Sequence, residues 1–457
     1  MLKRLLKPEV MNLFVVAIML VVPLYPKFPF INVPGTFVSI RVEDIIIALA
    51  SFVILGRILT DKFKIVRNNV LYAMIIFLIV GFVSLISALF ITKTITLHIG
   101  LLHWFRRLEY FIPFLLGFYA LRNIKDLNFY FKTMIIALLV IIVYGAGQRY
   151  LNWPIIATQN EEYSKGVALR FREGGHISST FAGHYDLSTF LVLVLPIFIN
   201  FLVLSFKKLK ATENVLLTFC ILGGMWLIAV SGSRISSVTF LISSVIALFL
   251  IKKYKFIPFL IIISIFISSI SPSLKARYMR LYEVTRVEIQ NIISYDFVDV
   301  AIANESSSGL PQKRVVIEPS PTPLPPFEDR STSIRLNVEW PRAVRSFLKN
   351  PLLGTGYSSI SLATDNDYLR LLGEIGLLGF LSFTLLLIHI VLEITKHFPF
   401  KEYEPLELAF ITGLSGGIIG ILVNGTFIDI FEASKFATIF WLLMGILLKL
   451  SHKYKYE

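Results

Sequence analysis

Long apolar stretches separated by short polar segments run along almost the whole chain. A helix needs about 20 mostly apolar residues to cross the hydrocarbon core of a membrane, and lipid offers no partners to open backbone groups. Each stretch therefore predicts a membrane-spanning helix. Twelve are predicted, at approximately 11–25, 43–59, 71–92, 108–121, 133–151, 185–205, 213–230, 235–251, 256–271, 367–394, 406–424 and 436–450. The pattern predicts an all-α fold, a polytopic membrane helix bundle.

The composition agrees with this fold. Only 16% of the 457 residues are charged and 55% are hydrophobic, whereas a soluble domain usually carries about 25% charged residues. The mean hydropathy is +0.73. The one cysteine, Cys220, excludes a disulfide framework within the chain and a cysteine-based metal site.

The basic residues predict the orientation of the bundle. With both termini in the cytoplasm, the short cytoplasmic segments carry roughly twice as many Lys and Arg residues as the short external loops, as the positive-inside rule requires. The net charge of +14 therefore reports topology, and no nucleic-acid partner is expected. No small-residue cleavage site follows the first apolar stretch, so we expect an uncleaved span in a multi-pass plasma-membrane protein.

One long segment interrupts the series of spans. The predicted regions are 1–271 with spans one to nine, 272–366 as a large external loop, and 367–457 with spans ten to twelve and a cytoplasmic tail. Within the loop, the Pro-rich segment 305–326 cannot bury enough apolar area to fold and is expected to form an extended tether. Amphipathic helices are predicted on either side of it, at 275–292 and 333–349.

Several arginines are expected at the external membrane face. Arg234 lies in a turn of a few residues between two apolar spans, and Arg335 and Arg342 are seven apart on one face of the second loop helix. The planar donor fork of arginine suits phosphate, although interfacial arginines also contact lipid headgroups. Arg106 and Arg107, at the mouth of the fourth span, either extend this cationic cluster or anchor the helix at the interface.

Asp365 precedes the tenth span, where free helix N–H groups favour an anion. It is a candidate general base, but it is also a good N-cap residue for the helix that follows. The helix end is expected to lower the pKa of its carboxyl, and a bound phosphate would raise it again. Arg370 and Glu374, four residues apart just inside the span, are predicted to form an ion pair.

The sequence gives no sign of a metal or nucleotide cofactor. Four histidines in the predicted external segments are too scattered for a known ligand spacing, namely His98, His103, His176 and His184. No phosphate-binding loop and no nucleophile elbow occurs.

The polar motifs together resemble the signature of the O-antigen ligase/polymerase family. They are the Ser231-Gly232-Ser233-Arg234 turn, Arg335 with Trp340, Asn350 to Gly356, Asp365 to Leu369, Glu374 to Gly379, and Asp429 to Glu432 with Trp441. The layout of spans around one large loop resembles that family over nearly the whole chain.

The resemblance implies transfer of a glycan from an undecaprenyl-diphosphate carrier to an acceptor hydroxyl at the external face of the membrane, without metal or nucleotide. The site residues that we predict are Asp365 as the catalytic carboxylate and Arg234, Arg335, Arg342, Asn366 and Tyr368 as substrate-binding residues. The ligase branch has a histidine where this chain has Asp365. This departure favours a polysaccharide polymerase over a ligase.

Two other functions are weighed against this one. A transporter or flippase of lipid-linked oligosaccharide also commonly has about twelve spans, but it predicts charges deep within the spans and short loops. A scaffold that binds anionic lipid through its loop helices is a further alternative. The expected partners are the lipid-linked donor, the glycan acceptor, the lipid membrane and, as a further candidate, a chain-length regulator.

Overall fold

The computed structural model describes residues 8–26, 31–32, 39–60, 68–156, 168–169, 175–272, 330–360, 363–396, 398 and 403–452, with isolated positions between 274 and 286. The Pro-rich segment 305–326 lies outside the described residues, and the predicted helix at 275–292 is described only at isolated positions.

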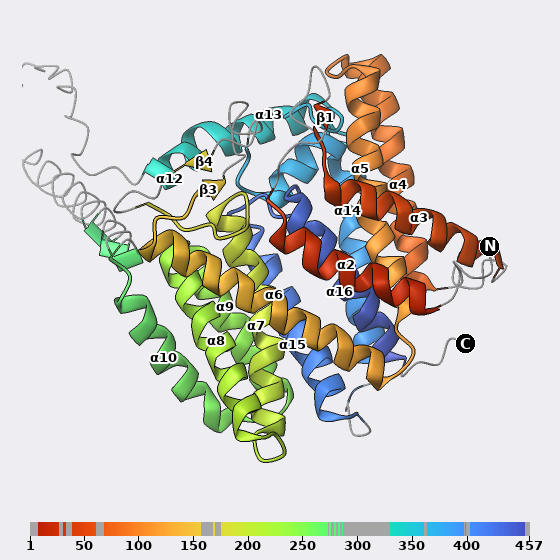
Figure 1. The fold of residues 1–457 in the computed structure, drawn as a ribbon. Coiled ribbons are helices and arrows are strands. Elements are labelled where there is room, and N and C mark those ends of the chain that lie inside the picture. Colours follow the sequence, from red (N-terminus) through yellow and green to blue (C-terminus); the bar gives the residue numbers. More distant parts are fainter. Residues whose placement is uncertain are drawn as a thin grey trace, which may run out of the picture.

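The described residues form a helical bundle with two very small strand pairs (Figure 1). The α-helices are α2 (Pro8–Leu24), α3 (Val42–Thr60), α4 (Asn69–Ser87), α5 (Leu97–Ala120), α6 (Ile124–Tyr150), α7 (His184–Ser205), α8 (Ala211–Ser231), α9 (Arg234–Leu250), α10 (Ile257–Ser269), α12 (Arg330–Ile334), α13 (Trp340–Lys349), α14 (Asp367–Thr395), α15 (Pro405–Asn424) and α16 (Ser434–Ser451). Shorter helical segments are the π-helices η2 (Ala88–Thr92) and η5 (Arg335–Glu339) and the 3-10 helix η4 (Tyr254–Phe256). The antiparallel pairs are β1 (Ile31–Asn32) with β2 (Ser39–Ile40), and β3 (Ile155–Ile156) with β4 (Ala168–Leu169).

Each of the twelve predicted apolar stretches falls on one of these helices, which confirms the all-α membrane fold class. Within the described ranges, seven helices are long and apolar enough to cross a membrane: α4 with η2, α6, α7, α8, α14, α15 and α16. Three more, α2, α9 and α10, are apolar but shorter. Helices α3 and α5 both carry charged residues within their length. The number of twelve spans therefore stays a prediction.

Helix α16 forms the centre of the bundle. All of its residues from Ser434 to Ser451 are buried, and it packs against α5 along its length. Its buried Lys435 ammonium donates to the carbonyl oxygens of Tyr25 (2.7 Å) and Thr180 (2.8 Å). This lysine therefore satisfies carbonyl groups beyond the end of α2 and before α7, where no helical bond is available to them.

Helix α15 packs very closely against α7 and α9 because small residues line its contact face. A Cβ atom on Gly413 would lie 2.6 Å from the Cα atom of Ile197, and one on Gly416 would lie 2.3 Å from the carbonyl oxygen of Ser243. Small residues allow this backbone approach in membrane bundles, where van der Waals contact stabilises helix association.

Helices α12, η5 and α13 lie across one end of the bundle (Figure 1). They form one helical run from Arg330 to Lys349, interrupted by the π-turn, and confirm the helix predicted at 333–349. The side of α13 packs on α14. This run places Arg335 and Arg342 at the same end of the bundle as the start of α14.

Helix α14 is broken at Gly376, whose φ of 69° and ψ of −170° are not helical. The loop after α13 fills the break. The backbone N–H groups of Leu377 and Leu378 donate to the carbonyls of Pro351 (2.8 Å) and Leu352 (3.1 Å), and that of Gly356 donates to Glu374 (2.7 Å). Backbone groups freed by a broken membrane helix must find partners within the protein. The 350–356 loop supplies them here.

Candidate functional site

Four helix ends meet beneath η5 and α13. Ser188 in the first turns of α7 donates to Ser236 of α9 (3.0 Å), and Asn424 at the end of α15 donates to Thr189 of α7 (2.8 Å). The N–H group of Asp367, at the start of α14, donates to the carbonyl of Gly425 (2.9 Å). Since α7, α9 and α14 all begin here, their positive N-terminal ends converge on one region, which favours an anion.

Arg335 and Asp365 form an ion pair at this end of the bundle. The Nε and Nη2 atoms of Arg335 donate to Oδ2 of Asp365 at 3.0 and 2.7 Å. Arg335 is only 9% exposed, and it also hydrogen-bonds the side chain of Tyr185 in α7. The pair therefore joins the loop helices, the α14 entry and α7. Two of the residues predicted for the site lie in direct contact.

Asp365 does not cap α14, so the capping alternative is wrong. The N-cap is Asn366, whose side-chain oxygen accepts from the N–H groups of Tyr368 (3.1 Å) and Leu369 (3.0 Å). The backbone of Asp365 has a left-handed φ of 49°, and its side chain turns to Arg335 instead. Burial raises the pKa of its carboxyl, although Arg335 opposes the shift. The helix end was expected to lower the pKa of Asp365, but the net shift is upward because the effect of burial is larger.

Asp429, in the loop between α15 and α16, holds the segment on both sides of Asp365. Its carboxylate accepts from the N–H groups of Thr364 (2.7 Å) and Asn366 (3.0 Å), and from Nη1 of Arg370 (3.0 Å). A left-handed non-glycine residue persists only where its surroundings fix it. Asp429 supplies that restraint at Asp365.

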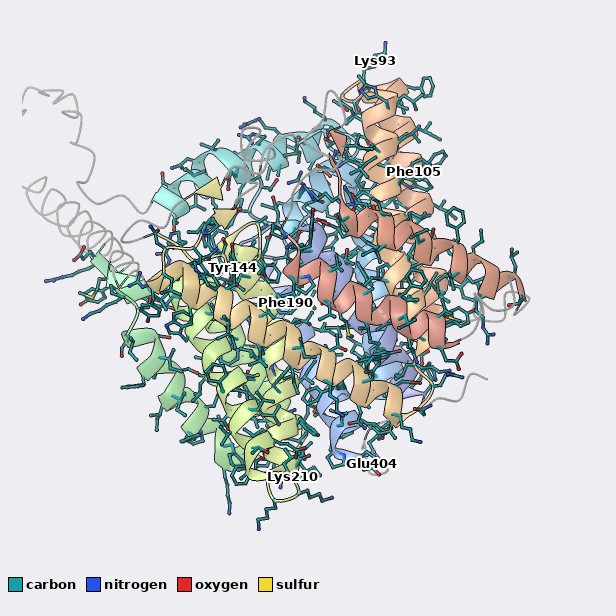
Figure 2. The ribbon with its side chains drawn as sticks, in the orientation of Figure 1. Lys93, Phe105, Tyr144, Phe190, Lys210 and Glu404 are labelled. Carbon is teal, nitrogen blue, oxygen red and sulfur yellow. The ribbon has the colours of Figure 1, made fainter. Side chains whose placement is uncertain are left out.

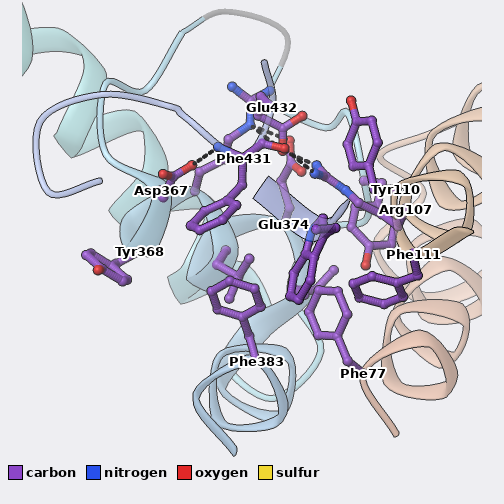
Figure 3. Close-up of a pocket in the computed structure, with 15 residues that line it drawn as sticks. Phe77, Arg107, Tyr110, Phe111, Asp367, Tyr368, Glu374, Phe383, Phe431 and Glu432 are labelled. Carbon is purple, nitrogen blue, oxygen red and sulfur yellow. Dashed lines mark hydrogen bonds and ion pairs between the residues drawn. The ribbon is translucent and has the colours of Figure 1, made fainter. Parts of the chain in front are cut away.

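A charge network lies next to this loop and consists of Arg107, Arg370, Glu374, Asp429 and Glu432. Figure 3 labels Arg107, Glu374 and Glu432 of this network. Arg370 pairs with Glu374 at 3.4 Å, which confirms the predicted ion pair, and lies 3.8 Å from Glu432. Arg107 of α5 pairs with Glu432 and donates to the carbonyl of Phe431. Burial alone would raise the pKa of Glu432, but Arg107 and Arg370 lower it to about 2. These two arginines are matched by three carboxylates, which suits a role in holding the loops together.

The cavity beside this network is too small for a sugar. Its volume is about 40 Å³, and its walls combine the charged residues with aromatic side chains such as Phe77, Phe383 and Trp441 (Figure 3). A volume of this size admits a few water molecules. The cavity as the structure has it does not hold a glycan, and the ion pairs around it join α5, α14 and the loop before α16.

Three neighbouring residues of η5 and α13 each carry a buried polar atom without a hydrogen-bond partner. Oε2 of Glu339, Nε1 of Trp340 and Nη1 of Arg342 are buried and make no hydrogen bond with the described residues. Burial and the nearby Asp365 carboxylate raise the pKa of Glu339 to about 7, against the opposing effect of Arg335. Buried donors and acceptors are normally paired. Two donors and one acceptor without partners are therefore features expected of a ligand site.

The remaining predicted residues have mixed positions. Arg234 begins α9, half-buried, and its carbonyl accepts from the hydroxyl of Tyr278 (3.3 Å). Asn366 is occupied by capping, and its Nδ2 donates to the carbonyl of Thr426 (3.0 Å). The Tyr368 hydroxyl donates to the carbonyl of Leu422 (2.6 Å). Asn366 and Tyr368 thus both bond backbone groups of the α15 end, and their role as substrate ligands stays a prediction.

Sequence reasoning missed Glu339, Tyr185 and the supporting roles of Asp429 and Glu432. Asp429 and Glu432 lie in a motif that carried the family resemblance, which was the only signal for them. Glu339 had a local signal, since it follows Arg335 by four residues on one helix face. Nothing in the sequence ties Tyr185 to a residue 150 positions later.

Among the described residues, no group of three or more His, Cys, Asp or Glu side chains is arranged to hold a metal ion. His176 and His184 stack with ring centroids 4.4 Å apart next to Tyr185. This histidine pair lies at the start of α7, next to Tyr185, the α7 residue that interacts with Arg335.

Comparison with known proteins identifies part of the chain. No curated protein matches it significantly. Residues 216–384 match the family described as O-antigen ligase. The matched segment includes Arg234, Arg335 and Asp365, and leaves out Asp429 and Glu432. The match confirms the resemblance drawn from the motifs: residues 216–384 of this membrane protein are similar to the O-antigen ligase family.

Proposed function

We propose that the protein is a metal-independent membrane glycosyltransferase that moves a glycan from an undecaprenyl-diphosphate carrier to an acceptor hydroxyl. The observation that carries this proposal is the ion pair between buried Arg335 and half-buried Asp365 within the matched family segment. A cation and a carboxylate in contact provide one group for the leaving diphosphate and one for the acceptor proton.

The reaction needs little beyond positioning and charge. The acceptor oxygen bonds to the anomeric carbon of the donor sugar, the bond from that carbon to the diphosphate breaks, and its electron pair leaves with undecaprenyl diphosphate. Arg335 stabilises the developing negative charge, with the unpaired Nη1 of Arg342 as a second donor. When the diphosphate engages Arg335, Asp365 loses part of its ion pair and becomes the better base for the hydroxyl proton.

An apolar groove of about 410 Å³ supports a lipid-linked donor. It lies between α8, α9 and α10, and Ser237, Lys275 and Tyr278 are among its lining residues. The hydroxyl of Tyr278 also donates to the backbone carbonyl of Arg234, so the groove reaches a residue that we predict to bind the substrate. We assign the isoprenoid tail to this groove.

The histidine-to-aspartate departure at Asp365 favours a polymerase, which adds repeat units to a growing lipid-linked glycan. A ligase transfers the same donor to a different acceptor by the same chemistry. We place the site on the external face of the plasma membrane with both termini in the cytoplasm, as the basic residues predict. A chain-length regulator is the partner that a polymerase would need.

Reconstitution with a purified donor tests the proposal. The full-length protein in liposomes is supplied with an undecaprenyl-diphosphate oligosaccharide, without metal or nucleotide, and the glycan is separated on a gel. A ladder of longer lipid-linked products identifies a polymerase, and transfer to another offered acceptor identifies a ligase. Movement of intact donor across the bilayer without a new glycosidic bond would identify a transporter and overturn the proposal.

Matched variants connect the activity to the site. Arg335→Ala is expected to reduce the rate roughly 100–1,000-fold, because one preorganised donor to the leaving group is lost. Arg335→Lys keeps the charge but loses the planar fork, so it should recover only part of the rate. Arg345→Ala, on exposed α13 surface, is the control and should retain the wild-type rate. Wild-type activity in Arg335→Ala would show that this site does not perform the reaction.

A further inference from the structure

A large apolar cavity lies at the end of the bundle opposite the candidate site. It has a volume of about 870 Å³ between α7, α8, α9 and α10, within the roughly 300–1,000 Å³ typical of small-molecule sites. Its walls are aliphatic and aromatic, including Phe206, Phe256 and Phe259. These three rings are 44–62% exposed, so the cavity opens toward the lipid-facing side of the bundle.

Three lysines form the polar rim of this cavity: Lys207 and Lys208 in the α7–α8 turn, and Lys253 in the α9–α10 turn. Both turns are fixed by backbone bonds. The N–H group of Lys208 donates to the carbonyl of Ser205 (2.7 Å), and that of Lys253 donates to Leu248 (3.0 Å). The cationic rim is therefore held at the mouth of the cavity by rigid backbone.

The charge around the rim is strongly one-sided. The same two turns carry three further lysines, Lys210, Lys252 and Lys255, and the nearest acidic residue along the chain, Glu213, is bonded to the N–H group of Lys210. An apolar cavity with a basic rim at the end of a helix bundle suits an amphiphile with an anionic head and hydrocarbon tails.

This cavity is separate from the site that contains Arg335. Tyr185, at the first turn of α7, contacts Arg335, whereas Lys207 follows the last turn of α7. A helix rises about 1.5 Å per residue, so the 22 residues of α7 separate the two sites by about 33 Å. Figure 2 labels Lys210 at the end of the bundle far from Lys93. The two sites therefore lie near opposite ends of α7, a helix long and apolar enough to cross a membrane.

We propose that this cavity binds an anionic phospholipid of the cytoplasmic leaflet, with its phosphate at Lys207, Lys208 and Lys253 and its acyl chains along the apolar walls. The lipid fills the space between α10 and the α7–α8 pair and joins them. The choice of leaflet rests on the orientation given under the proposed function, whereas the binding of an anionic lipid in this cavity does not depend on the glycan-transfer reaction.

Lipid titration of the full-length protein tests this site. Native mass spectrometry in detergent would measure binding of dioleoyl phosphatidylglycerol and, in parallel, of zwitterionic dioleoyl phosphatidylcholine. We expect the anionic lipid to bind more tightly. The triple variant Lys207→Gln, Lys208→Gln and Lys253→Gln should weaken its binding by on the order of 100-fold, since each lysine near a headgroup contributes about 1 kcal/mol.

A second triple variant is the matched control. Lys210→Gln, Lys252→Gln and Lys255→Gln remove the same charge from the same two turns, away from the cavity lining, and should leave binding of phosphatidylglycerol close to wild type. Equal losses in both triple variants would mean that only general surface charge attracts the lipid. Equal affinity of the wild type for both lipids would likewise overturn the proposal.

One further variant tests whether the acyl chains of the lipid enter the cavity, without changing any charge. Thr218 lines the cavity from an exposed position of α8, so Thr218→Trp narrows the cavity while all lysines remain. We expect weaker phosphatidylglycerol binding and an unchanged unfolding midpoint in the absence of lipid. Unchanged binding in Thr218→Trp would show that the acyl chains do not enter the cavity.

Discussion

The break in α14 at Gly376 depends on two backbone features, and replacing this residue tests both. In Gly376→Ala, the new Cβ would lie 2.4 Å from the carbonyl carbon and oxygen of Leu352. The φ and ψ of 69° and −170° belong to a region that is almost restricted to glycine, where another residue costs about 1–3 kcal/mol. Neither problem can be relieved by a side-chain rotation, because the obstructing atoms are backbone.

The expected result is detachment of the 350–356 loop from α14. Two hydrogen bonds, from Leu377 and Leu378 to the loop, would then be lost at about 1 kcal/mol each. Together with the backbone strain, the destabilisation comes to roughly 3–5 kcal/mol. The N-terminal part of α14 carries Arg370 and Glu374, so we expect at least a tenfold loss of glycan transfer together with a lower unfolding midpoint.

The assay combines thermal unfolding in detergent, followed by tryptophan fluorescence, with the liposome transfer assay. Leu378→Ala is the control, because this neighbouring side chain is 44% exposed and Leu378 bonds the loop through its backbone N–H group, which alanine retains. Gly354→Ala should resemble Gly376→Ala, since its Cβ would meet Glu374 backbone at 2.4 Å. The double variant should lose little more than either single one, because both disrupt the same contact. Equal behaviour of Gly376→Ala and Leu378→Ala would refute the reasoning.

Other predictions concern the charged groups. Glu432→Gln removes the carboxylate that pairs with Arg107, whereas Arg370 keeps Glu374 and Asp429, and should lower stability by about 3–5 kcal/mol, measured as the unfolding midpoint. The pKa of Glu432 in the folded protein is lowered to about 2 from 4.5, so its contribution to folding stability is fully present above pH 4.5 and is lost as the pH falls toward 2. The stability of Glu432→Gln should therefore change less with pH between 4.5 and 2 than that of the wild type. The pKa of Glu339 is about 7. If its carboxylate assists proton removal, the transfer rate rises with pH through 7 and Glu339→Gln abolishes this rise. The same pH–rate profile in the variant and the wild type would exclude this role. Asp365→Asn keeps the shape but not the base, and should reduce the rate about 100-fold or more. Dialysis against EDTA should leave the rate unchanged, and a loss restored by Mg²⁺ would contradict metal-independent transfer.

The helices were predictable because lipid imposes one strong rule on the sequence. A segment within the membrane must be apolar and must satisfy its own backbone bonds, so hydropathy alone marked every long helix among the described residues. The ion pair of Arg370 and Glu374 was also predictable, since both lie on one helix face four residues apart. The membrane helices and the Arg370–Glu374 pair both depend on residues close together in the sequence.

Contacts between distant segments were not predictable. Asp429 bonds Thr364 and Arg370, which lie about 60 residues earlier, and Arg107 reaches Glu432 over 325 positions. The alternative in which Asp365 caps α14 was wrong for a different reason. Asp365 and Asn366 are adjacent and have nearly equal capping preference, so the sequence could not rank them. The contact with Arg335 and the hydrogen bonds to Asp429 determine which of the two caps the helix.

The complete burial of α16 has a consequence for how the bundle is assembled during synthesis. This helix emerges from the ribosome after every other described helix, yet its residues from Ser434 to Ser451 form the centre of the bundle. The earlier helices must therefore enter the bilayer before their central partner is present, and the apolar and polar side chains that pack on α16 stay open to lipid until it arrives. Chains released before α16 would lack their central helix, and we expect membrane proteases to recognise them as incomplete. Quality control of this protein would then depend on α16, which follows all the other described helices along the chain.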